Sequence, residues 1–188
     1  DRRSDSFQGF MLLMRDYRFS EARTSTLSRW SPAPDTLRGS GNADALLLEA
    51  ARRTVDSARR DEQFLETGLA LLALGQPQQA AESFRAGLAR TPGDAALHLN
   101  LSAAFLELCR VSCSNEERAE ALQNADRALS NPDQAEAAAF NRALALEGLG
   151  RREEARNAWE AFRDTTGDIS WQQEALGHLE RIRPGGQL

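Results

Sequence analysis

Few residues of this chain carry side chains that could act as a nucleophile, a base or a metal ligand. The sequence contains two histidines, His98 and His178, and two cysteines, Cys109 and Cys113. A catalytic cysteine needs a neighbouring base or a positive environment that favours its thiolate, and nothing in the sequence signals such an activated thiol. The metal-binding patterns CxxC and HExxH do not occur. The sequence therefore predicts no enzyme, no cofactor and no metal site.

The two cysteines are close enough along the chain to form a local disulfide. Two cysteines do not, however, make the disulfide framework that is typical of small secreted domains. We therefore favour two free thiols at Cys109 and Cys113, with a local bond as the alternative.

The composition is that of packed helices. Among 188 residues, Val and Ile occur only at Val55, Val111, Ile169 and Ile182, whereas the strands of a parallel sheet are rich in both. Ala, Leu, Glu, Gln and Arg dominate, and these residues favour helices. The sequence therefore predicts an all-α fold.

The charge pattern excludes some classes of partner. All 23 basic residues are arginines, which indicates a bacterial genome of high GC content, and 28 acidic residues bring the net charge to −5. Neutralising phosphates supplies most non-specific affinity for nucleic acid, so we expect no nucleic-acid partner. The apolar run at residues 10–14 is too short for a membrane span, which takes about 20 residues.

The sequence gives only indirect information on the cellular compartment of the protein. The chain begins with Asp1 and not with Met, which predicts a fragment or a processed chain. We expect a cytoplasmic protein, with a periplasmic or other extracytoplasmic domain of a longer protein as the alternative.

The N-terminal part differs from the rest. Residues 1–41 carry scattered aromatic residues, then two prolines and a Gly-Ser-Gly run, which predicts an irregular or extended segment that ends in a linker. Residues 42–60 have apolar residues at helical spacing and predict a leading helix.

A pattern of leucine, glycine, alanine and an aromatic residue then occurs twice, 75 residues apart. Its first copy comprises Leu71, Leu74, Gly75, Ala80 and Phe84, and its second comprises Leu146, Leu149, Gly150, Ala155 and Trp159. Glycine at this position is typical of the end of a helix, where the backbone turns left-handed.

A third, weaker copy lies between them. Shifting Phe64 and Leu71 by 34 residues gives His98 and Phe105, but the following helix aligns only after seven further residues. We place this insertion in a longer loop at residues 109–115, after which Ser114 and Glu117 form a capping box. His98 falls where two helices pack, and we expect a partly buried imidazole with its hydrogen bonds satisfied.

These repeats resemble the tetratricopeptide (TPR) family, whose unit is a helix pair of about 34 residues. The resemblance covers residues 61–167. It implies a right-handed solenoid of three helix pairs, at residues 61–94, 95–135 and 136–169. Ser170 can cap a last helix at residues 170–183, of the kind that closes the end of such arrays.

A second resemblance reaches into the N-terminal part. Arg18, Phe19, Ala22 and Arg23, followed by the repeats through residues 140–146, are similar to the region upstream of the peptidase domain in some bacterial caspase-like (CHAT) proteins. No part of a peptidase domain lies in this sequence. The resemblance implies a regulatory or recognition region of a larger protein.

In the TPR family the first helix of each pair lines a concave groove. The resemblance places Leu65, Glu66, Leu69 and Leu72 on its wall from the first unit, Leu99, Asn100, Ala103 and Leu106 from the second, and Phe140, Asn141, Leu144 and Glu147 from the third. Asn100 and Asn141 occupy the same repeat position. The resemblance implies that they hold the backbone of an extended peptide, since an amide both donates and accepts.

The sequence therefore predicts a non-catalytic protein–protein interaction module that binds a peptide or helix of a partner in this groove. One alternative is a regulatory region of a larger caspase-like peptidase or another sensor protein, whose partner is another domain of the same longer chain. Another is a scaffold that self-associates as a homodimer. The chain's own residues 7–30 could also fill an apolar groove, and we expect residues 1–35 to pack against the helical array.

Overall fold

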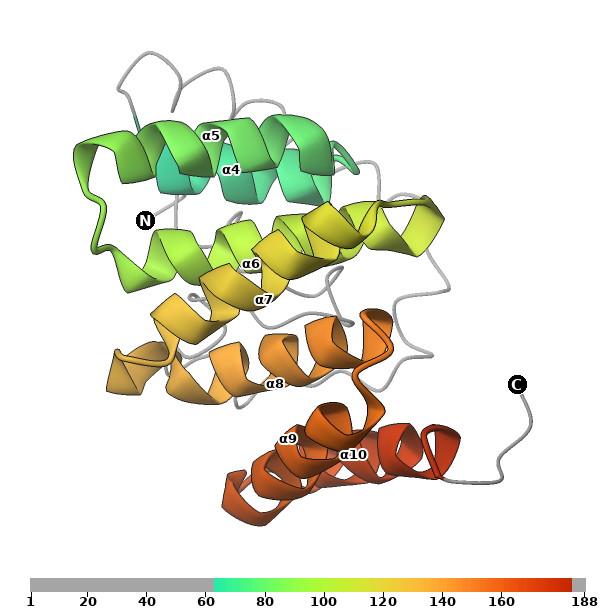
Figure 1. Ribbon diagram of the computed structural model, residues 1–188. Coiled ribbons are helices and arrows are strands. Elements are labelled where there is room, and N and C mark those ends of the chain that lie inside the picture. The colour runs from blue at the N-terminus through green and yellow to red at the C-terminus, as the bar shows by residue number, and fades with distance from the viewer. Residues whose placement is uncertain (1–62, 184–188) are drawn as a thin grey trace, which may run out of the picture.

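The structure is a computed structural model, and it describes residues 63–183. In this range the chain forms seven α-helices and no strand (Figure 1): α4 (Phe64–Ala73), α5 (Pro77–Arg90), α6 (Ala95–Val111), α7 (Asn115–Ala128), α8 (Pro132–Gly148), α9 (Arg152–Thr165) and α10 (Ile169–Arg181). The predicted all-α fold class is confirmed. The predictions for segment 1–41, for a leading helix at 42–60 and for packing of residues 1–35 lie outside the described residues.

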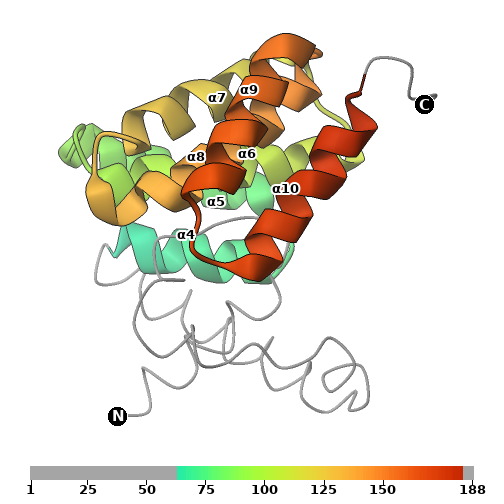
Figure 2. The same cartoon turned by 90° about the horizontal axis from the view of Figure 1, so that it is seen from below.

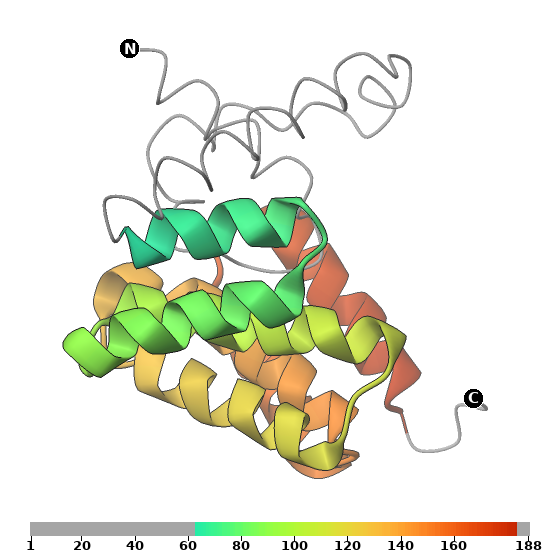
Figure 3. The same cartoon turned by 90° about the horizontal axis from the view of Figure 1, so that it is seen from above.

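Successive helices pack against each other in order. The pairs α4–α5, α6–α7 and α8–α9 are each joined by a short turn, and α5–α6 and α7–α8 contacts link one pair to the next. Contacts also join α4 to α6 and α6 to α8, so these three helices form one layer, and α5 and α7 lie in front of it in Figure 1. Figure 3 shows the α4–α5 pair from above, and Figure 2 shows α10 beside α9 at the far end.

The first helix of the first and third pairs ends in the same way. Gly75 and Gly150 have φ of 68° and 71°, a left-handed conformation that glycine adopts without steric cost. After α4, the N–H groups of Gly75 and Gln76 donate to the carbonyls of Leu72 and Leu71, and Gly150 and its successor repeat this arrangement after α8. These are the two bonds of a Schellman motif. The predicted helix ends at Gly75 and Gly150 are therefore confirmed.

The prediction of a longer loop in the middle pair is wrong, because the extra residues lengthen its two helices. Helix α6 continues six residues past Phe105, whereas α8 continues only two past the equivalent Leu146. Helix α7 begins six residues before Ala121, whereas α9 begins three before the equivalent Ala155. The four and three extra residues account for the whole insertion, and the turns of the two pairs are equally long. The α6–α7 pair consequently projects beyond its neighbours (Figure 1).

Side chains mark the starts of several helices. Ser114 and Glu117 form the predicted capping box before α7: the Glu117 N–H donates to Ser114 Oγ, and the Ser114 N–H donates to the Glu117 carboxylate. Helix α10 differs from the prediction, because its cap is Asp168. The Asp168 carboxylate accepts from the N–H groups of Ser170 and Trp171, so Ser170 lies in the first turn of α10.

The core contains large rings packed against small residues. Phe84 of α5 is fully buried, and its ring lies against Gly68 of α4, where a Cβ atom would come 2.2 Å from Phe84 Cε1. Near the other end, Phe140 packs edge-to-face on Trp159 and Phe162, with ring centroids 5.1 Å and 5.5 Å apart. Such aromatic pairs stabilise beyond the area that they bury.

Replacing Gly68 by alanine tests the close approach of α4 and α5. Because the buried Phe84 ring cannot yield without repacking, we expect Gly68→Ala to lower the free energy of unfolding by about 1–3 kcal/mol. The matched control is Gly177→Ala in α10, where nothing lies within 4 Å of the new Cβ. This control should stabilise by about 0.5–1 kcal/mol, since Ala is the better helix former. Urea unfolding followed by circular dichroism measures both, and stabilisation by both changes would contradict the packing.

Candidate functional site

The structure buries most of the residues that were predicted to line the groove. Leu99, Asn100, Ala103, Phe140 and Asn141 have no exposed surface, and Leu69, Leu72 and Leu106 are also buried. Leu65, Glu66, Leu144 and Glu147 are half-buried. The twelve residues lie on α4, α6 and α8 as three groups, but only these four reach the surface.

Asn100 and Asn141 are not accessible to a bound peptide in this arrangement. Both are fully buried, and Asn100 Nδ2 donates to the carbonyl of Ala96 in its own helix at 2.7 Å. Leu99, next to Asn100, packs against Ala128 of α7 and Ala138 of α8. In the described arrangement, this part of α6 contributes to the core between the second and third pairs.

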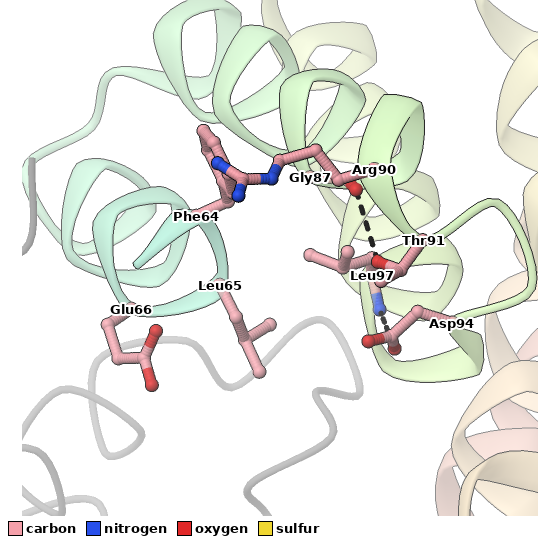
Figure 4. Close-up of a pocket in the computed structure, with 8 residues that line it drawn as sticks. All are labelled: Phe64, Leu65, Glu66, Gly87, Arg90, Thr91, Asp94 and Leu97. Carbon is pink, nitrogen blue, oxygen red and sulfur yellow. Dashed lines mark hydrogen bonds between the residues drawn. The ribbon is translucent and has the colours of Figure 1, made fainter. Parts of the chain in front are cut away.

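A cavity of about 350 Å³ opens at the first pair, where three helix ends meet (Figure 4). The start of α4, the end of α5 and the start of α6 supply its walls, which consist of Phe64, Leu65, Glu66, Gly87, Arg90, Thr91, Asp94 and Leu97. Leu65 and Glu66 are thus the two predicted groove residues that line a cavity. Its volume is at the lower end of the range for ligand pockets.

The walls of this cavity combine apolar and charged groups. Phe64, Leu65 and Leu97 supply apolar surface, and the Arg90 guanidinium lies 5.8 Å from the centroid of the Phe64 ring, within the range of a cation–π contact. The Asp94 carboxylate accepts from the N–H groups of Ala96 and Leu97 at 2.9 Å and 3.1 Å. It therefore caps α6 and helps to fix the cavity wall.

Gly87 makes room for the two apolar walls to meet. A Cβ atom at this position would lie 2.8 Å from Leu97 Cδ1 and 3.0 Å from Phe64 Cβ. The sequence repeats did not indicate Phe64, Arg90, Thr91 or Asp94 as site residues, because these residues belong to helix ends. The available signal was Gly87, a glycine inside a helical pattern, which often marks close packing.

Glu147, predicted as a groove residue, instead joins three helices. Its Oε2 atom accepts from Trp159 Nε1 at 3.0 Å and lies 2.7 Å from His178 Nδ1, and Arg181 Nε is 3.6 Å from Oε1. The His178 ring stacks on Trp159 with centroids 4.0 Å apart. Through these contacts, α10 is attached to both α8 and α9.

His178 Nδ1 lies within hydrogen-bond distance of two charged groups, an acceptor on Glu147 and a donor on Arg181. It lies 2.5 Å from Arg181 Nη2 as well as 2.7 Å from the carboxylate of Glu147. One nitrogen cannot donate to the Glu147 carboxylate and accept from the Arg181 guanidinium at once, and we assign its proton to the charge-assisted bond with Glu147.

Burial by itself raises the pKa of Glu147. The hydrogen bond and charge of His178, the hydrogen bond from Trp159 and the charge of Arg181 together outweigh burial and hold this pKa below its usual value. The ionised carboxylate is therefore the form that fits this site.

His98 occupies the buried position that the sequence predicted for it. Its ring is 4% exposed, with Nδ1 2.8 Å from Asn124 Oδ1 and Nε2 2.9 Å from the carbonyl of Pro92. The expected imidazole with hydrogen-bond partners is confirmed.

The preference for two free thiols is wrong. Cys109 and Cys113 form a disulfide with a Sγ–Sγ distance of 2.08 Å, because the end of α6 brings the two side chains together. Neither sulfur is then a free nucleophile. Within residues 63–183, no group of three or more His, Cys, Asp and Glu side chains is placed to hold a metal ion.

No family model, curated protein or solved structure matches this chain. In the described part of the chain, no helix combines the length and the apolar character that crossing a membrane requires.

Replacing Glu147 by glutamine tests the link between α10 and the rest of the array. Since hydrogen bonds to charged groups contribute about 1.5–3 kcal/mol, we expect Glu147→Gln to lower the free energy of unfolding by about this amount near neutral pH. A carboxylate with a lowered pKa stabilises above its unfolded-state pKa and loses this contribution as the pH falls through its folded-state pKa.

The difference in the free energy of unfolding between wild type and Glu147→Gln should therefore shrink as the pH falls below the unfolded-state value of 4.5 and through the lower folded-state pKa of Glu147. Urea unfolding across this pH range measures it. The exposed Glu160 on α9 provides the control, because Glu160→Gln should change stability little at any pH. A difference for Glu147→Gln that stays constant with pH would contradict the assignment of an ionised carboxylate.

Proposed function

We propose that this chain is a TPR-like module that binds a peptide or helix of a partner protein without doing chemistry on it. The observation that carries the proposal is the cavity at the first helix pair. It is lined by two residues of the predicted groove, Leu65 and Glu66, and by the apolar side chains of Phe64 and Leu97. A partner side chain that enters this site would contact the half-buried Phe64 and Leu65 and lie near the charged groups of Glu66 and Arg90.

The TPR-like, right-handed solenoid is part of this proposal. Its support is the repetition of local geometry: Gly75 and Gly150 end equivalent helices with equivalent hydrogen bonds, and helix pairs follow one another with contacts only to near neighbours. Arrays of this kind leave the residues at one side of the stack free for an extended partner.

Self-association through α10 is a second candidate. Ile169 and Leu176 lie seven residues apart on this helix, which places them on one face, and they are 71% and 45% exposed. Two apolar side chains on an end helix are a possible contact between two copies. The resemblance to caspase-like (CHAT) proteins is compatible with either candidate, as a recognition region of a longer chain.

Peptide selection tests binding at the cavity. A phage-displayed library of random peptides should yield binders that share an apolar residue, and Leu65→Glu should weaken their binding at least about tenfold, a loss of about 1.4 kcal/mol. The control is Gln78→Glu, at an exposed position of α5 outside the cavity. Fluorescence polarisation with the selected peptides measures both, and circular dichroism verifies that both variants fold.

Two results would contradict the proposal. One is a selection that enriches no peptide above a column without protein. The other is a peptide affinity that Leu65→Glu and Gln78→Glu lower equally, or that neither change lowers. Light scattering on the wild type and on Ile169→Asp separates the second candidate, because only self-association through α10 predicts a dimer that this change dissociates.

A further inference from the structure

The end of the α6–α7 pair that projects beyond the other pairs is tied by the disulfide. Cys109 lies in the last turn of α6, and Cys113 lies in the turn that leads to α7. Cys109 is one of the four residues by which α6 is longer than its equivalent, and Cys113 comes shortly before the three residues by which α7 is longer. Within residues 63–183, the projecting end extends beyond the ends of α4–α5 and α8–α9, and the disulfide ties its two helices together.

The turn that contains Cys113 also contacts the third pair through Arg118. The carbonyl of Cys113 accepts from Arg118 Nη1 at 3.2 Å, and the same nitrogen donates to Asn115 Oδ1 at 3.2 Å. The Arg118 stem lies beside Gly148 at the end of α8, where a Cβ atom would come 3.4 Å from Arg118 Cδ. The turn that holds Cys113 is thus linked through one arginine to the end of α8.

Local capping adds a second constraint on the same turn. Ser114 follows Cys113 and begins α7 through its reciprocal bonds with Glu117. The backbone from Cys109 to Ser114 is consequently fixed at one end by a covalent bond and at the other by a capping box. Beside the disulfide, the Ser112 N–H donates a long backbone hydrogen bond to the carbonyl of Leu108, at 3.4 Å.

We propose that the Cys109–Cys113 disulfide is a redox-dependent staple that holds the projecting end of α6–α7 and its Arg118 contact with α8. Opening the staple takes two electrons and two protons from a dithiol reductant. Attack of one thiolate of the reductant on one sulfur breaks the Cys109–Cys113 bond, forms a mixed disulfide and releases the other cysteine, which takes up a proton. The second thiol of the reductant, as its thiolate, then attacks the mixed disulfide and releases the remaining cysteine, while the reductant becomes a disulfide. Oxidation by a protein disulfide reverses these steps.

The staple implies an environment for the folded chain. Disulfides form and persist in oxidising compartments and are kept reduced in the cytosol. The oxidised form therefore points to an extracytoplasmic site of action, which is the alternative that the sequence analysis kept beside a cytoplasmic location. In a reducing compartment, the same pair would leave the end of α6 untied. This inference does not depend on the cavity or on any partner.

Thermal unfolding with and without reductant tests the staple on the full chain. The entropic account of a loop this short predicts that reduction with tris(2-carboxyethyl)phosphine lowers Tm by about 4–8 °C. The double variant Cys109→Ser/Cys113→Ser should show the lower Tm in both conditions and no response to the reductant. Alkylation followed by mass spectrometry should find both cysteines blocked before reduction and both labelled after it.

Hydrogen exchange locates the effect. Reduction should speed exchange of the amides at residues 106–118 at least about fivefold, while those of α5, which lies in another pair, stay unchanged. Free thiols in the air-oxidised chain would overturn the proposal. So would a closed disulfide whose reduction changes neither Tm nor exchange at residues 106–118.

Discussion

The described structure depends on the close approach of helix axes at positions where one side chain is small. Gly68 leaves room for the ring of Phe84, and its equivalent in the third pair, Ala143, is fully buried. A helix pair cannot bury its own apolar face alone, so each pair must stack on the next. The large rings Phe84 and Trp159 fill the space between them, with no exposed surface. The fold is thus a consequence of size alternation along the repeat.

The middle pair meets the same constraint with different chemistry. Its residue equivalent to Phe84 and Trp159 is Ala125, and the small position opposite is Ser102, so both partners are small and both are fully buried. Here His98 extends across to Asn124 of α7 and to the carbonyl of Pro92. Polar contacts therefore hold this pair where a ring holds the others. Ser102 Oγ is buried without a hydrogen-bond partner, a cost that neighbouring contacts must offset.

Features that depend on nearby residues could be predicted from the sequence, and those that depend on distant ones could not. The helix ends at Gly75 and Gly150 and the capping box at Ser114 are local, and they were predicted. The longer loop was wrong because no glycine follows Leu108 to end α6, so the helix continues to Val111 and brings Cys109 to Cys113. The partners of Glu147 come from α9 and α10, and the cavity needs three helix ends, so repeat positions alone indicated neither.

Three places in the array depart from the repeat, and each has a different structural consequence. At the far end, Glu147 and the stacked rings of Trp159 and His178 attach α10, which closes the last pair. In the middle, the disulfide ties the one helix end that projects beyond its neighbours. At the first pair, Gly87 and the meeting of three helix ends leave an open cavity. The first two positions are therefore occupied by the chain's own contacts, whereas the third leaves a space of about 350 Å³ between helix ends.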